Sequence, residues 1–167
     1  MKEVKIEFLN ITGFPRGTLC GMLADAYSFD PRWAAEWSEE WRSFDDFFFD
    51  HPAIAEKYGF ITAVDGEPVG FITWDPRKRP ESEEIGYNCI LTKYKQCGYG
   101  TLQLREAVRR ILLDRPRRII VTTNASLVPA QKMYERAGFR KTGERPSASF
   151  AGNLLDYEYA PAAARDR

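Results

Sequence analysis

The chain lacks the clusters of metal-ligating side chains that would indicate a metalloprotein. It has one histidine, His51, and three cysteines, Cys20, Cys89 and Cys97, whose spacings fit neither a zinc motif nor an even disulfide framework. We therefore expect free thiols and no bound metal. The chain also lacks a Gly-x-x-x-x-Gly-Lys-Ser/Thr loop, which holds a magnesium-bound triphosphate. This absence excludes a nucleotide hydrolase of that class.

The sequence also lacks an excess of one charge and any long hydrophobic run. Lys plus Arg and Asp plus Glu number 24 each in 167 residues, so the net charge provides no general attraction to nucleic acid or to an anionic membrane. The amino terminus has no signal-peptide core, and no apolar run is long enough to cross a bilayer. We expect a cytoplasmic monomer or homodimer, with neither nucleic acid nor membrane as a partner.

Hydrophobic periodicity predicts alternating strands and helices. The length fits one domain, which we place at residues 1–160, with a C-terminal tail at 161–167. Strands are predicted at 2–9, 59–64, 69–74, 84–92, 118–123, 139–144 and 153–160. Helices are predicted at 18–27, 31–50, 100–114 and 129–137. This order predicts an α/β fold with a mixed β-sheet.

A strand, a short loop and a helix follow one another closely between Asn88 and Thr101. The segment Lys95–Gly100, here called the glycine loop, contains Gly98 and Gly100, which allow sharp turns and a close approach of the backbone to a ligand. The first N–H groups of the following helix and the positive end of its dipole favour an anion. The stretch therefore predicts a phosphate-binding site.

The helix after the glycine loop is amphipathic. Its apolar face carries Leu104, Ala107, Val108, Ile111 and Leu112, and its polar face carries Gln103, Arg105, Glu106, Arg109 and Arg110. For the arginines Arg109 and Arg110 of the polar face we expect contact with solvent.

Two motifs resemble those of the GNAT superfamily of N-acetyltransferases. Lys95-Gln96-Cys97-Gly98-Tyr99-Gly100 is similar to its Arg/Gln-x-x-Gly-x-Gly/Ala pyrophosphate loop, with Lys at the first position. Downstream, Pro129–Phe139 resembles a later helix of the family, with its Tyr and its Ala-Gly-Phe ending. The resemblance implies acetyl-CoA as co-substrate, no metal, and a GNAT-like mixed, splayed β-sheet flanked by helices, with the pantetheine arm in the splay.

The resemblance also implies which residues bind the co-substrate, mostly through main-chain groups. They are Asn88, Ile90, Lys95, Gln96, Cys97, Gly98, Tyr99, Gly100, Thr101 and Asn124. Ile90 matches the strand residue whose backbone pairs with the pantetheine arm. Asn124 is included on the condition that the 125–128 turn folds back, because Leu127 holds the usual position of the family's Asn.

Two residues are expected to be catalytic. Tyr134 matches a tyrosine that acts as general acid, and a phenol with a pKa of ~10 can donate its proton to a thiolate at neutral pH. Core packing is the alternative for Tyr134, which lies on the apolar face of its helix. Glu84 is our choice of general base, acting through water, and a solvated surface position is the alternative for it. Glu83 lies beside it, and the alternatives for a cationic acceptor are Asp45, Asp46 and Asp50.

The predicted 31–50 helix carries an aromatic stripe at helical spacing, formed by Trp33, Trp37, Trp41, Phe44 and Phe48. Core packing alone accounts for such a stripe. The family, however, places its acceptor site on early helices, and aromatic rings beside carboxylates favour a cation on a hydrophobic body. We therefore expect Trp33, Trp37, Asp45 and Asp46 to bind the substrate.

Together these patterns predict an acetyl-CoA-dependent N-acetyltransferase. The acceptor is a primary amine of a small molecule or of a protein or peptide. The alternative is a catalytically silent acyl-CoA-binding module with the same fold.

Overall fold

The computed structural model describes residues 2–160. The chain divides into two compact units. The first comprises the residues up to Thr73 together with Tyr87–Gln103, and the second comprises Trp74–Gly86 and the residues from Leu104 on. The predicted tail at 161–167 lies outside the described residues, and the single domain over 1–160 stays a prediction.

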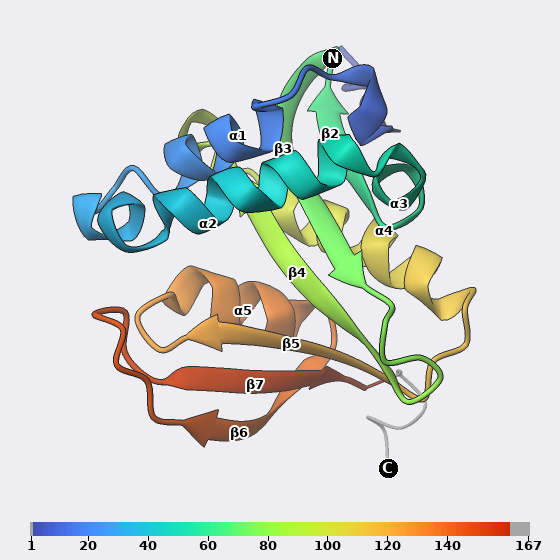
Figure 1. Ribbon diagram of the computed structural model, residues 1–167. Coiled ribbons are helices and arrows are strands. Elements are labelled where there is room, and N and C mark those ends of the chain that lie inside the picture. Colours follow the sequence, from blue (N-terminus) through green and yellow to red (C-terminus); the bar gives the residue numbers. More distant parts are fainter. Residues whose placement is uncertain (1, 161–167) are drawn as a thin grey trace. The chain divides into compact units, whose positions relative to one another are not determined.

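Most predicted elements are present (Figure 1). The strands are β1 (Ile6–Leu9), β2 (Gly59–Val64), β3 (Glu67–Asp75), β4 (Ser82–Ile90), β5 (Arg118–Asn124), β6 (Phe139–Arg145) and β7 (Leu154–Tyr159). The helices are α1 (Thr18–Ala26), α2 (Pro31–Asp50), α3 (Pro52–Lys57), α4 (Tyr99–Leu112) and α5 (Val128–Arg136), with the 3₁₀ turns η1 (Ile11–Gly13) and η2 (Thr92–Tyr94). The strand predicted at 2–9 is shorter, and α3 was not predicted.

The first unit contains an antiparallel arrangement of β1, β2 and β3, with the end of β4 next to β3. The β2–β3 hairpin turns at Asp65 and Gly66, whose φ angles of 50° and 83° suit a tight hairpin turn. Figure 1 shows α1 and α2 across one face of these strands. Phe44 of α2 stacks on Phe71 of β3 at 6.2 Å between ring centroids, so part of the aromatic stripe packs on the sheet.

The second unit combines parallel and antiparallel pairing. The start of β4 pairs in parallel with β5, from Ser82↔Arg118 to Ile85↔Val121. The next neighbours, β7 and then β6, are antiparallel. The predicted α/β class with a mixed sheet flanked by helices is thus confirmed, and the parallel β4–β5 ladder ends at Ile85.

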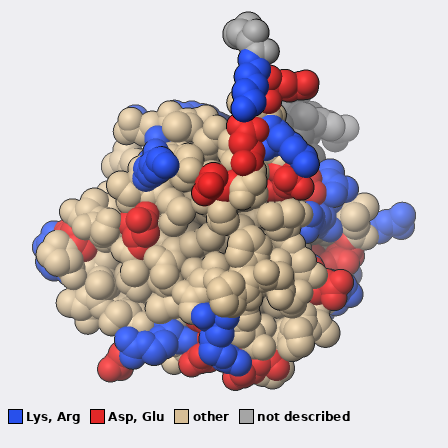
Figure 2. All heavy atoms as spheres, turned by 90° about the horizontal axis from the view of Figure 1, so that it is seen from above, with Lys and Arg blue, Asp and Glu red and all other residues tan. Residues whose placement is uncertain are grey.

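The charged side chains do not separate by sign on the face seen in Figure 2. Lys and Arg lie interspersed with Asp and Glu, mostly around the margin of a broad area without charge. Among the described residues, no helix is both long enough and apolar enough to cross a membrane. The predicted cytoplasmic location stays a prediction.

Candidate functional site

The glycine loop has the backbone geometry of a tight turn into α4. Gln96 and Gly98 have φ angles of 63° and 86°, in the left-handed region that a glycine adopts without strain. A Cβ atom at Gly98 would meet no atom within 4 Å. Backbone conformation, and not lack of space, therefore favours glycine at this position. The loop leads into the first turn of α4 at Tyr99, whose N–H groups have no carbonyl partner within the helix.

Gln103 holds the first turns of α4 against the strands of the same unit. Its Nε2 donates to the carbonyl oxygen of Phe71 at 2.8 Å, to Asn88 Oδ1 at 2.7 Å and to the carbonyl oxygen of Cys89 at 3.2 Å. Its Oε1 accepts a hydrogen bond of 2.7 Å from the Thr62 hydroxyl. Gln103 is fully buried, although the sequence places it on the polar face of the helix.

The end of β4 lies very close to β3. A Cβ atom on Gly70 would come within 2.2 Å of the Cys89 carbonyl oxygen, so only glycine fits opposite this residue. Burial raises the pKa of the Cys89 thiol to about 12, which keeps the thiol neutral and excludes it as a nucleophile. Asn88 and Ile90 are partly exposed. Their contacts with the co-substrate stay predictions, and the Asn88 side-chain oxygen already accepts from Gln103.

Lys95 and Cys97 of the glycine loop differ in the contacts that their side chains make. Lys95 turns to the end of α1, where its ammonium donates to the Ala26 carbonyl oxygen. Cys97 is exposed, and its Sγ lies 3.6 Å from the Lys95 carbonyl oxygen. The one charged side chain of the loop, that of Lys95, is therefore engaged by a neighbouring segment.

The second unit contains the two residues expected to be catalytic. Tyr134 of α5 is buried, with 5% of its surface exposed, and its ring lies 5.7 Å from that of Phe139 and 6.0 Å from that of Tyr157. Glu84 is half-buried and pairs in register with Ile120. Glu83 precedes it on the strand and is fully buried. Both catalytic roles stay predictions.

Asn124 ends β5, and the turn after it is tied to a neighbouring loop. Its main-chain oxygen accepts from the Leu127 N–H at 3.0 Å. The N–H groups of Ala125 and Ser126 donate to the carbonyl oxygens of Asn153 and Ala151. Main-chain hydrogen bonds therefore fix the conformation of the 125–128 turn, on which the prediction for Asn124 depends. The contact of Asn124 with the co-substrate stays a prediction.

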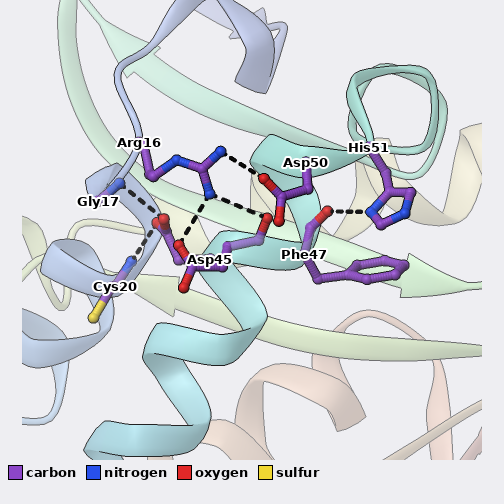
Figure 3. Close-up of polar contacts among 8 residues, drawn as sticks. Arg16, Gly17, Cys20, Asp45, Phe47, Asp50 and His51 are labelled. Carbon is purple, nitrogen blue, oxygen red and sulfur yellow. Dashed lines mark hydrogen bonds and ion pairs between the residues drawn. The ribbon is translucent and has the colours of Figure 1, made fainter.

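At the carboxyl end of α2, three aspartates bind neighbouring groups (Figure 3). Asp45 is buried and accepts from the N–H groups of Gly17 at 2.8 Å and Cys20 at 3.0 Å. It thereby caps the first turn of α1, whose own N-cap, Gly17, has no side chain to do so. Asp46 and Asp50 accept from Arg16 at 3.0 Å and 2.6 Å. The roles of Asp45 and Asp46 in substrate binding stay predictions.

The segment between α1 and α2 and the part of α2 up to Trp41 form an aromatic cluster, defined here as Tyr27, Phe29, Trp33 and Trp41. The ring of Tyr27 lies 4.8 Å from that of Trp33 and 5.6 Å from that of Trp41, and Phe29 lies 6.5 Å from Trp33. Trp37 is half-buried nearby in sequence, and its indole N–H is enclosed without a hydrogen-bond partner among the described residues. This part of α2 thus encloses a polar donor whose hydrogen bond no described residue accepts.

The fold is α/β, with a tight, glycine-containing turn between a strand and a helix. A sequence model of the acetyltransferase (GNAT) family matches residues 21–139. The match spans well over half of the chain and contains both motifs. The chain therefore belongs to the acetyltransferase (GNAT) family.

Solved structures share the fold. A GNAT-family protein from Desulfovibrio desulfuricans is 19% identical, with a TM-score of 0.73 over 93% of this chain and 98% of the other. The ribosomal-protein-S18-alanine N-acetyltransferase from Escherichia coli is 17% identical, with a TM-score of 0.67 over 94% and 93% of the two chains. A Bacillus anthracis protein in complex with acetyl coenzyme A is 19% identical, with a TM-score of 0.56 over 62% and 61%. No curated protein matched this sequence.

Proposed function

We propose that this protein is an acetyl-CoA-dependent N-acetyltransferase that acts on a primary amine of a small molecule or of a protein or peptide. The observation that carries the proposal is the glycine loop, with its left-handed Gln96 and Gly98 directly before α4. Membership of the family supports acetyl transfer. The acetyl-CoA complex of one structural neighbour and the N-acetyltransferase activity named for another support the donor and the amine acceptor.

The loop fits a pyrophosphate for two reasons. Successive N–H groups of a tight turn and of a helix start form a concave set of donors, which binds phosphate oxygens. The space beside Gly98 is open, because a Cβ atom there would meet nothing within 4 Å. We therefore assign pyrophosphate binding to the main chain of residues 95–101, with Ile90 and Asn88 beside the pantetheine arm. Asn124 is a further proposed contact.

Acetyl-CoA supplies the activated thioester, and this chain's residues move the protons. In our proposal Glu84 accepts a proton from the amine nitrogen through water as the new C–N bond forms. Tyr134 donates its hydroxyl proton to the sulfur as the C–S bond breaks. The product is an amide and the free thiol. The burial of Tyr134 among the rings of Phe139 and Tyr157 supports this role by fixing the ring orientation.

The acceptor is proposed to bind at α2. The half-buried Trp37 favours an amine that carries an apolar or aromatic body, and Trp33 is proposed as a second contact, although only 6% of its surface is exposed. Asp45 and Asp46 were the expected partners of its charge. Both are engaged with α1 and Arg16, so the aromatic end of α2 provides the better supported contacts.

The proposal is tested by measuring free thiol released from acetyl-CoA across a panel of amines. The panel includes aliphatic amines, arylalkylamines and a peptide with a free amino terminus. We expect at least one amine to accelerate release, with an acetylated product that resists hydroxylamine, as an amide does. A silent acyl-CoA-binding module would bind acetyl-CoA without amine-dependent release, and that result would refute the enzymatic function.

A further inference from the structure

Lys95 occupies the first position of the glycine loop, yet its ammonium is engaged inside the first unit. It donates to the Ala26 carbonyl oxygen at the end of α1 and lies 4.8 Å from the centroid of the Phe29 ring. Burial lowers the pKa of this ammonium, while the charge of Asp25 raises it. An ammonium over an aromatic face is attracted to the ring electrons. Lys95 is thus held by a carbonyl, a ring and a nearby carboxylate.

A second link joins the same two segments. The Thr92 N–H donates to Asp25 Oδ1 at 2.7 Å, and the Thr92 hydroxyl donates to the Asp25 carbonyl oxygen at 2.8 Å. Thr92 begins η2, directly after β4 and before the glycine loop. The segment leading into the loop is therefore fixed to the end of α1, and Lys95 extends this attachment into the loop itself.

Phe29, the ring beneath Lys95, belongs to the aromatic cluster. It contacts both Tyr27 and Trp33, at 6.2 Å and 6.5 Å between ring centroids, although 60% of its own surface is exposed. A movement of the glycine loop that displaces Lys95 therefore changes the environment of a ring packed on Trp33. The ammonium of Lys93, by contrast, lies over the ring of its neighbour Tyr94 at 5.3 Å.

We infer that Lys95 is a positioning residue, whose ammonium couples the glycine loop to the aromatic cluster and leaves phosphate binding to the main chain. The inference rests on the proposed function, because it assumes that coenzyme A occupies the loop. A ligand that changes the loop conformation then also changes the packing of the aromatic cluster, because Lys95 contacts both. Such a change is transmitted only by contacts that differ between the free and the bound conformation. The loop and the proposed acceptor end of α2 thereby respond to each other.

The test uses the full chain with Trp74→Phe as background, so that Trp33, Trp37 and Trp41 are the remaining fluorophores. Coenzyme A is titrated into this background, into Lys95→Met and into the matched control Lys93→Met. Calorimetry gives the affinity, and tryptophan fluorescence at saturation gives the response of α2. Lys95→Arg and Phe29→Leu are added, because Arg keeps a cation over the ring and Leu removes the ring without touching the loop.

We expect Lys95→Met to bind coenzyme A within ~3-fold of the background, a change well below the tenfold that corresponds to 1.4 kcal/mol. Its fluorescence response should fall to less than about half, as in Phe29→Leu, and the double variant should lose no more than either alone. Lys93→Met and Lys95→Arg should keep the response.

A loss of affinity of tenfold or more in Lys95→Met alone, with the fluorescence response intact, would make Lys95 a phosphate ligand and overturn the inference. An unchanged response in both Lys95→Met and Phe29→Leu would overturn it as well, and Phe29→Leu decides the matter if Lys95→Met does not fold. A background protein that binds no coenzyme A at all refutes the proposed function itself, and the calorimetric trace separates that failure from the other two.

Discussion

In the proposed reaction the glycine loop acts through its main chain, whereas α5 acts through a side chain. Lys95 in the loop and Gln103 in the first turns of α4 direct their side chains to internal contacts, so we assign ligand binding to the main chain of the loop. In α5, the proposed role belongs to one hydroxyl, that of Tyr134, inside a packed aromatic environment. A main-chain site tolerates side-chain changes that keep its geometry. A side-chain site fails when one atom is removed.

The largest expected effect is on the side-chain site. Tyr134→Phe removes only the hydroxyl, and the loss of a general acid should lower kcat by ~10²-fold. The affinity for acetyl-CoA and the melting temperature should stay close to wild type. Tyr157→Phe is the matched control, because it makes the same change in a ring 6.0 Å away. Full activity in Tyr134→Phe would leave core packing as the role of this residue.

Gln103 should stabilise the first turns of α4, which follow the glycine loop. Gln103→Leu keeps a similar volume but leaves the Thr62 hydroxyl and two carbonyl groups without this partner. Buried groups that lose their hydrogen bonds should lower the free energy of unfolding by about 2–3 kcal/mol, measured by urea denaturation. Adding Thr62→Val removes one of these polar groups and should recover part of the loss. An unchanged free energy would show that the amide network does not stabilise α4.

A smaller effect is expected from Asp45, where a side chain supports main-chain groups of α1. Asp45→Asn leaves one carboxamide oxygen for two N–H donors, and the weaker cap should lower the free energy of unfolding by about 1 kcal/mol. Asp46→Asn is the comparison, because its pair with Arg16 is exposed and exposed pairs contribute little. If Asp45→Asn instead raised only the Michaelis constant for the amine, Asp45 would be an acceptor contact.

The smallest effect should come from within the loop itself. Cys97 is exposed, and its thiol makes one weak contact, with the Lys95 carbonyl oxygen. Cys97→Ser should change the Kd for acetyl-CoA by less than ~2-fold, since main-chain N–H groups do the binding. Calorimetry measures this Kd. A marked loss of affinity would show that side chains of the loop also bind acetyl-CoA, so that the loop and α5 would not differ in this respect.

The sequence predicted the loop, α5 and most of the strands, because these depend on local periodicity and on Gly and Pro at helix ends. It did not predict α3, whose six residues are too few to show a helical period. Nor could periodicity find the partners of Lys95, Asp45 and Gln103. Gln103 adjoins the arginines of the polar face in sequence, and only the strands packed against α4 make its burial favourable.

We propose that the glycine loop binds the pyrophosphate of acetyl-CoA. Calorimetric titration of acetyl-CoA into Gly98→Asp and Gly98→Asn tests this binding most directly. Both side chains tolerate the positive φ of 86° at this position, and they differ chiefly in charge. We expect Gly98→Asp to bind acetyl-CoA at least ~10-fold more weakly than Gly98→Asn, because a carboxylate beside the phosphates repels them by 1.4 kcal/mol or more. Equal affinities in the two folded variants would contradict it.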